Sequence, residues 1–166
     1  MSQISWWVSK TRRFAGHLRA RVTADELAAL EAWTTPAQRA LFASMPVADQ
    51  RHGLDVLAHL RAESVDDPDV LLAGLLHDAG KGHAVRVWHR IAWSLGERYG
   101  PRVRGAARRI PGFAGPLDRL RDHAEISAQM AAGAGCPERT IELIRHQAEP
   151  RDPEYGRLLK LADESC

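Results

Sequence analysis

The chain has 166 residues, of which 45% are hydrophobic and 27% charged, and its formal net charge is only +2. This length suits one compact domain with a single core, and no run of about 18 apolar residues predicts a transmembrane helix. Two cysteines, Cys136 and Cys166, are too few for a disulfide framework, and the opening residues lack the order of a secretory signal, so we expect a cytoplasmic protein.

Helix signals recur along the first half of the chain, whereas strand signals are nearly absent. Thr23 and Glu26 fit a capping box before a helix that begins at about residue 24. The pair Thr35-Pro36 fits an N-cap and a first-turn proline for a helix through about residue 45. Two more helices are predicted at about 47–63 and 68–79, and the second ends in the run LLAGLLHDAGKG.

The second half of the chain continues this pattern after Gly80 and Gly82, which break or bend the preceding helix. Residues 84–99 are predicted to be a helix with an apolar stripe that includes Trp88. Gly100-Pro101 interrupts it, and residues 111–116 form a loop. Further helices are predicted at about 117–133, 137–147 and 154–165. The fold class is therefore all-α, with one helical domain over residues 23–166.

Residues 1–22 form a basic amphipathic segment in front of this domain. They carry five Lys or Arg and no acidic residue, and Trp7, Phe14 and Leu18 fall near one side of a predicted helix. Such a segment packs its aromatic residues onto the domain or onto a second subunit, or it lies on an anionic membrane surface. The sequence favours packing over membrane contact, and a homo-oligomer stays open.

A second basic block covers residues 84–121, with nine arginines and two acidic residues. It begins directly after the HDAGKG segment, so its first arginines, Arg86 and Arg90, are candidates to bind a phosphorylated ligand. A solvated basic face is the alternative, and composition favours it. We expect no nucleic acid partner.

Several side chains that can bind a metal or carry a proton border the apolar faces of the predicted helices. They are His52, His77, Asp78, His123, His146 and Asp163. A lone histidine on an apolar face is normally a satisfied core residue, but burying several such groups unpaired is costly when they are charged. A shared divalent metal removes this cost, and imidazole nitrogen with carboxylate oxygen suits Fe, Mn, Zn or Ni. A metal site between the central helices is therefore predicted.

This ordered pattern resembles the HD-domain metal-dependent phosphohydrolase superfamily. The segment HDAGK (77–81) is similar to the HDxGK element that many members carry, and LLKLADES (158–165) resembles their terminal Asp segment. HAEISAQM (123–130) and IRHQAE (144–149) resemble the two further histidine segments of the dinuclear branch. The likeness covers about residues 47–165, and it implies a compact bundle of helices.

The resemblance also implies which residues bind the ions, as one or two divalent metals among Fe, Mn, Ni, Zn and Mg. The first ion would be held by His52, His77, Asp78 and Asp163. The second would be held by Asp78, His123 and His146. Asp78 and Lys81 would be the catalytic pair, with Lys81 meeting a substrate phosphate, and Gly80 and Gly82 would let the backbone approach that phosphate closely.

The implied reaction is hydrolysis of a nucleotide or another small phosphoester by a metal-bound hydroxide. Cleavage of cyclic dinucleotides is disfavoured, because Gln147 follows His146 where that branch has a second histidine, and no Gly-Tyr-Pro segment occurs. Diadenosine tetraphosphate hydrolases are a closer match in ligand count, whereas one-metal ppGpp hydrolases do not account for His123 and His146. A metal-binding regulatory module with little turnover and a di-iron oxygenase are the alternatives.

Overall fold

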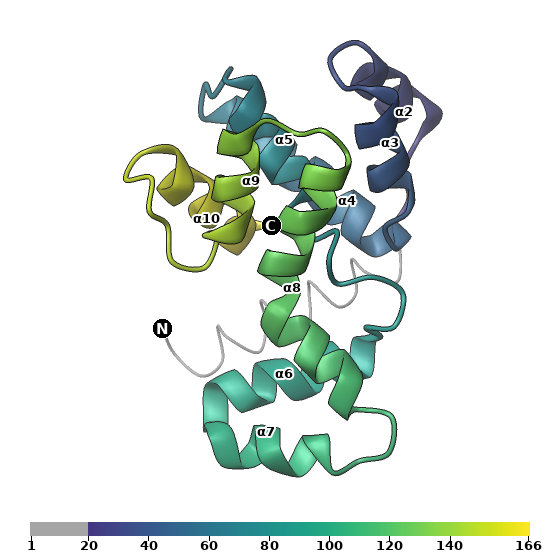
Figure 1. The fold of residues 1–166 in the computed structure, drawn as a ribbon, viewed down its shortest axis with the longest axis vertical. Coiled ribbons are helices and arrows are strands. Elements are labelled where there is room, and N and C mark those ends of the chain that lie inside the picture. Colours follow the sequence, from purple (N-terminus) through teal and green to yellow (C-terminus); the bar gives the residue numbers. More distant parts are fainter. Residues whose placement is uncertain (1–19) are drawn as a thin grey trace.

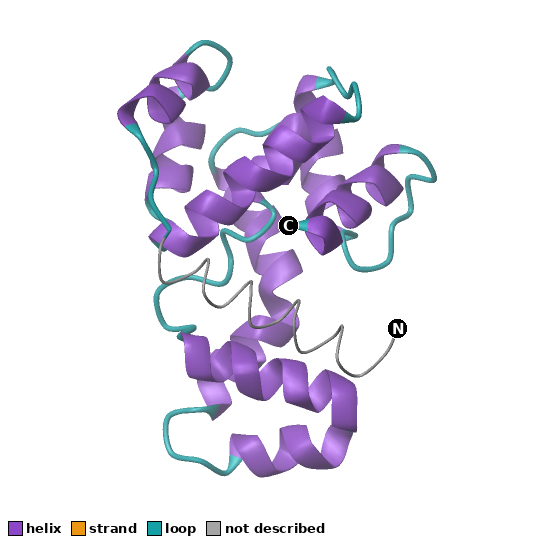
Figure 2. Ribbon diagram, turned by 180° about the vertical axis from the view of Figure 1, so that it is seen from behind, coloured by secondary structure: helices purple, strands orange, loops and turns teal. Residues whose placement is uncertain are grey.

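The computed structural model describes residues 20–166, and every regular element in that range is an α-helix (Figures 1 and 2). This confirms the all-α prediction. In chain order the helices are α2 (Ala24–Glu31), α3 (Pro36–Ala43), α4 (Val47–Ala62), α5 (Pro68–Leu76), α6 (Val87–Tyr99), α7 (Pro101–Arg108), α8 (Ala114–Gly133), α9 (Glu138–Arg145) and α10 (Tyr155–Ser165). Nearly all of the predicted amphipathic segment, 1–22, lies outside the described residues. None of the described helices has the length and apolarity needed to cross a membrane.

Side-chain caps start helices α2 and α3 where the sequence predicts them. The Thr23 hydroxyl accepts from the Glu26 N–H at 3.2 Å, and the Glu26 carboxylate accepts from the Thr23 N–H at 2.9 Å. Thr35 and Gln38 make the same reciprocal pair at the start of α3, with Pro36 in its first position. These caps satisfy backbone N–H groups that have no partner inside the helix, so they fix where α2 and α3 begin.

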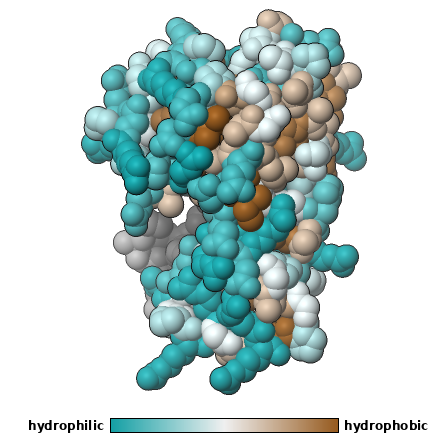
Figure 3. Space-filling model, in the orientation of Figure 1, coloured by the Kyte–Doolittle hydropathy of each residue, from teal (hydrophilic) through white to brown (hydrophobic). Residues whose placement is uncertain are grey.

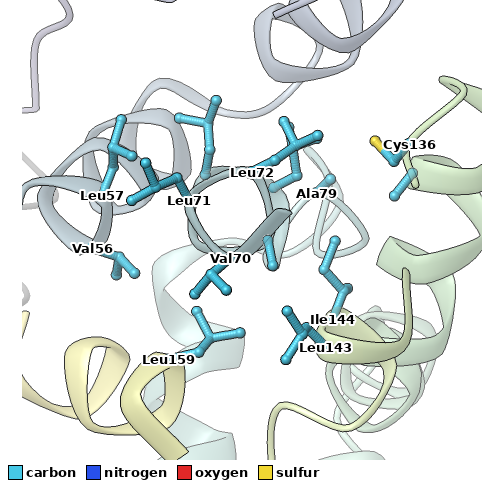
Figure 4. Packing of buried hydrophobic residues seen from close by; sticks show 14 of the residues in the cluster. Val56, Leu57, Val70, Leu71, Leu72, Ala79, Cys136, Leu143, Ile144 and Leu159 are labelled. Carbon is cyan, nitrogen blue, oxygen red and sulfur yellow. The ribbon is translucent and has the colours of Figure 1, made fainter. Parts of the chain in front are cut away.

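Helix α5 lies at the centre of the main hydrophobic core. All its residues from Val70 to Leu76 are buried, as expected for a helix that is apolar on every side. It packs against α4, α9 and α10, and Figure 4 shows Val56 and Leu57, Leu143 and Ile144, and Leu159 from these neighbours around it. The segment that follows α5 therefore starts in the most buried part of the molecule.

A smaller hydrophobic cluster lies apart from this core, where α6 and α7 pack against the first half of α8. Its buried members are Val85, Ala107, Leu117 and Leu120. We call residues 85–113, which contain α6 and α7, the α6–α7 lobe. In Figure 1 this lobe lies below the helices around α5, and α8 runs through both parts.

Several helix boundaries differ from the prediction for local reasons. Helix α5 ends at Leu76 and not at about residue 79 as predicted, and residues 77–84 form a series of turns. Helix α7 is an element that the sequence analysis missed: Pro101, read there as an interruption, occupies the first turn of a new helix, where its missing N–H costs nothing. Helix α8 begins at Ala114, inside the predicted loop, for the same reason, since Pro116 lies in its first turn.

Trp88, part of the stripe predicted on α6, does not face the interior. Trp88 is 68% exposed, whereas α6 packs into the smaller cluster through Ala92 and Trp93. Gly96 lets α7 approach closely on this inner side, because a Cβ there would meet the Arg104 Cβ at 3.0 Å. Figure 3 shows hydrophilic residues over much of the lobe on the face it presents, with only small hydrophobic areas.

Candidate metal centre

Three helices bring His52, His77 and Asp163 together at one end of the core. His52 lies on α4, His77 caps the C-terminus of α5, and Asp163 lies on α10. Each offers one ligand atom, and these atoms all lie within 4.8 Å of one another. The His52 Nε2 and Asp163 Oδ1 atoms are 2.8 Å apart, and the His77 Nε2 is 3.5 Å from the same oxygen. The structure thus gathers residues that are 111 positions apart in the sequence.

The His77 ring is oriented as a metal ligand would be. Its Nδ1 donates to the Gly74 carbonyl oxygen at 2.9 Å, which leaves the lone pair of the neutral ring on Nε2. The side chain is 1% exposed, and Nε2 is buried with no hydrogen-bond partner among residues 20–166. Burial lowers the pKa of His77, but the neighbouring carboxylates of Asp78 and Asp163 raise it to about 9. The His77 Nε2 atom is therefore placed where it can bind a proton or a metal ion.

Asp78 is the next residue and is equally buried, with 2% of its side chain exposed. Its Oδ1 lies 3.6 Å from the Nε2 atoms of both His77 and His123, and its Oδ2 contacts the Lys81 ammonium. Burial raises the pKa of Asp78, but Lys81 and His77 lower it more, so the pKa lies well below its usual range. Asp78 is therefore a carboxylate at neutral pH and can bind a cation.

His123 approaches Asp78 from α8. Its Nδ1 donates to the Leu120 carbonyl oxygen at 2.7 Å, so its Nε2 faces Asp78 in the same way as that of His77. Burial is the main reason that the pKa of His123 lies below its ordinary value, with Asp78 acting in the opposite direction. A neutral His123 ring whose Nε2 lone pair faces the Asp78 carboxylate could bind a second cation together with that carboxylate.

Two glycines allow the helices to approach closely enough for these contacts. A Cβ at Gly53, next to His52, would meet the Leu75 carbonyl oxygen of α5 at 2.5 Å. A Cβ at Gly80 would meet the His123 carbonyl oxygen of α8 at 2.4 Å. Gly80 therefore serves the packing of the 77–84 turns on α8.

Three polar residues that the sequence analysis did not assign to the site hold the 77–84 turns in place. The buried Ser127 hydroxyl accepts from the Gly80 N–H at 2.8 Å, and the buried Gln147 amide donates to the His77 carbonyl oxygen at 3.1 Å. Arg119 Nε donates to the Lys81 carbonyl oxygen at 3.0 Å. Ser127 had a visible signal, because it follows His123 by four residues and so shares its face of α8.

The remaining predicted residues lie at different places. His146 caps the C-terminus of α9 with its Nε2 3.4 Å from Glu142 Oε2, and no ion-pair contact joins it to Asp78 in the described chain. Arg90 donates to the buried Asp49 at 2.7 Å, and Arg86 is exposed at the start of α6. The ligand role of His146 and the substrate roles of Arg86 and Arg90 stay predictions.

The donors fit a divalent metal. His52, His77 and Asp163 provide two imidazole nitrogens and a carboxylate oxygen, with Asp78 adjacent, and this set suits Fe, Mn, Ni or Zn. The strongest indication is the buried His77 Nε2, since an unpaired polar atom in a core is expensive unless another group binds it.

Comparison with known proteins agrees with this geometry. A family model described as HD domain matches residues 50–165, which contain every predicted metal ligand. No curated protein and no solved structure matches the chain.

Proposed function

The chain belongs to the HD-domain superfamily of metal-dependent phosphohydrolases, and from this premise we propose that it hydrolyses a nucleotide or another small phosphoester. One observation carries the proposal. His77 Nε2 is fully buried and has no hydrogen-bond partner among the described residues, in a group that also contains His52 and Asp163. A core histidine kept for packing alone would have both ring nitrogens satisfied.

Each residue of the centre has a definable part in such a reaction. His52, His77, Asp78 and Asp163 would hold a divalent ion, and His123 would hold a second one together with Asp78. A divalent ion held by these residues would supply Lewis-acid chemistry, lowering the pKa of a water molecule and polarising a phosphoryl oxygen. The buried Asp78 stays ionised, so it can orient the water and accept a hydrogen bond from it.

Lys81 is the cation nearest to Asp78 and contacts its Oδ2 directly. Its side chain has four rotatable bonds, so the ammonium can move from Asp78 to a substrate oxygen while residue 81 stays fixed by Arg119. There it would neutralise the charge that develops on the phosphoryl group in the transition state.

The test combines elemental analysis with an assay of turnover. Protein purified without oxygen is analysed for Fe, Mn, Ni and Zn, and phosphate release is then screened over nucleotides and phosphoesters with Mn²⁺, Fe²⁺, Mg²⁺ and Ni²⁺. We expect bound metal and metal-dependent phosphate release, both lost in His77→Ala. The matched control is His59→Ala, which removes a partly exposed histidine from α4 two helical turns beyond His52.

Other outcomes would favour the alternative functions. Bound metal with no phosphate release from any substrate would support a regulatory module. Bound iron with oxygen uptake and no phosphate release would support an oxygenase. Either result would contradict the proposed hydrolysis while leaving the metal centre intact.

A further inference from the structure

One face of α8 contacts the 77–84 turns at regular intervals. Ser127, His123 and Arg119 are spaced by four residues, and so they lie on one side of the helix. Ser127 binds the Gly80 N–H, His123 faces the Asp78 carboxylate, and Arg119 binds the Lys81 carbonyl oxygen. The first residue fixes the turn and the second faces the metal centre. The third lies one helical turn further toward the α6–α7 lobe.

Arg119 is anchored through one of its three guanidinium nitrogens, Nε. Its Nε is engaged with the Lys81 carbonyl oxygen, and among the described residues its two terminal nitrogens have no hydrogen-bond or ion-pair partner. The group lies over Gly82, where its Nη2 would be 3.2 Å from a Cβ. Gly82 has a φ of +61°, so a glycine there both adopts this turn without strain and leaves room for the guanidinium.

Three other arginines of this region pair with carboxylates of the protein itself. Arg108 and Arg121 both pair with Asp118, and Arg121 also binds Asp122. Arg90 pairs with Asp49. Arg119, by contrast, is a fixed positive charge with no carboxylate partner in the described part of the chain. Lys81 also links Arg119 to the metal centre. Its ammonium group contacts Asp78, and its carbonyl oxygen accepts a hydrogen bond from Arg119.

We propose that Arg119 forms a second anion site beside the metal centre, so that the preferred substrate carries a second phosphoryl group next to the one that is cleaved. The inference rests on the proposed function, because it assigns the first phosphoryl group to Asp78, Lys81 and His123. A guanidinium held by its Nε presents its terminal N–H donors as a fork, which matches two oxygens of a phosphate. The rise of four residues along α8 is about 6 Å, a separation that a diphosphate or longer phosphate chain can span. A phosphomonoester leaves Arg119 without a ligand.

The direct test is binding without turnover. Titration calorimetry of the full chain with Mg²⁺ present compares imidodiphosphate, which mimics a diphosphate and resists hydrolysis, with orthophosphate. We expect the wild type to bind imidodiphosphate more tightly than orthophosphate. In Arg119→Gln the ratio of these two affinities should fall by about tenfold, as for the loss of one charge-assisted contact. Gln keeps an amide donor for the Lys81 carbonyl oxygen while it removes the charge. The control is Arg121→Gln, whose guanidinium is exposed and paired with Asp118 and Asp122.

The results separate this inference from the proposed function. If Arg119→Gln binds both probes as the wild type does, or weakens both equally, then Arg119 has no phosphate of its own and the inference is wrong even where phosphate release is observed. If the preference is lost only in Arg119→Gln, the second anion site stands whether or not a substrate is turned over. Arg119→Lys, which keeps the charge but lacks the fork, should retain part of the preference, and circular dichroism should show that all variants are folded.

Discussion

The helices around α5 and the α6–α7 lobe both contain many charged side chains, but they satisfy them in different ways. In the lobe and the adjoining start of α8, charges pair at the surface, as Arg108 and Arg121 do with Asp118. Around the end of α5, by contrast, His77 and Asp78 are almost completely buried, and His77 Nε2 has no hydrogen-bond partner among residues 20–166. The Arg108–Asp118–Arg121 group is satisfied by its own side chains. The buried group has donor atoms that could hold a metal ion.

This difference explains why the two regions respond differently to substitution. Surface ion pairs contribute little to stability, because water screens them and mobile side chains lose freedom when they pair. Buried charges are costly to separate from their partners and are retained where they serve binding or catalysis. We therefore expect the largest effects in the centre formed by α4, α5, α8 and α10, and small effects among the exposed pairs of the lobe.

Asp78→Asn is expected to have the largest effect on function. It removes the charge that faces His77, His123 and Lys81 at once, so metal content should fall and phosphate release should drop by more than about 100-fold, the upper range for loss of an outer partner of a metal site. Asp118→Asn makes the same chemical change beside the lobe and should leave both measurements unchanged. If Asp78→Asn and Asp118→Asn lost metal content and phosphate release equally, the buried centre and the surface pairs would not differ in their response to substitution.

Arg90→Met tests the ion pair that joins the two regions. Arg90 of α6 binds Asp49 of α4, whose side chain has no exposed surface. The other Asp49 oxygen, Oδ1, has no hydrogen-bond partner in the described part of the chain. Leaving this carboxylate alone should cost about 3 kcal/mol in the free energy of unfolding, measured with urea. The double variant Asp49→Leu with Arg90→Met should recover most of the loss, since an apolar pair needs no partner. Additive effects would mean that the two side chains are not coupled.

Sequence reasoning predicted the parts of this molecule that depend on local signals. Thr23 and Thr35 cap α2 and α3 as predicted, because capping depends on neighbouring residues. The approach of His52, His77 and Asp163 was expected from an ordered motif, and their distances are visible only in the fold. The ion pair of Arg90 with Asp49 was not foreseen, because Asp49 is 41 residues away in the sequence. Ser127 and Gln147 were not assigned, because their partners are backbone atoms of distant turns.

Ser127→Ala should have a moderate effect that reaches the metal centre through the backbone. The Gly80 N–H would be left without an acceptor in a buried place, at a cost of about 1–3 kcal/mol in stability. Metal affinity should fall by about tenfold, because the turn that carries His77 and Asp78 loses one of its fixed points. Gln129→Ala removes an exposed polar residue from the same helix and should change neither thermal unfolding nor metal affinity. A normal metal affinity in a destabilised Ser127→Ala would show that the centre does not depend on this contact.

The pH dependence of stability should have a definite sign at His77. In protein stripped of metal, the nearby carboxylates of Asp78 and Asp163 outweigh the effect of burial and raise the pKa of His77 from 6.5 to about 9. A raised pKa contributes stability that is fully present below pH 6.5 and is lost as the pH rises through about 9. The melting temperature with chelator present should therefore fall over this interval. Added metal needs the unprotonated Nε2, so its stabilising effect should grow as the pH rises. A melting temperature that is flat over this range would contradict the raised pKa.

His89 of the lobe should show the opposite dependence, and a smaller one. Burial lowers its pKa, and the charge of Arg86 lowers it further. Its Nδ1 accepts from the Arg86 N–H at 3.0 Å and its ring packs edge-on against Phe113, so the folded lobe prefers the neutral ring. The stability that this preference provides is present above pH 6.5 and is lost as the pH falls below that value. His89→Asn should flatten only the acidic side of the stability profile, and His77→Gln only the alkaline side. If one variant flattened both sides, the two histidines would titrate as one unit and the core and lobe would not be electrostatically separate.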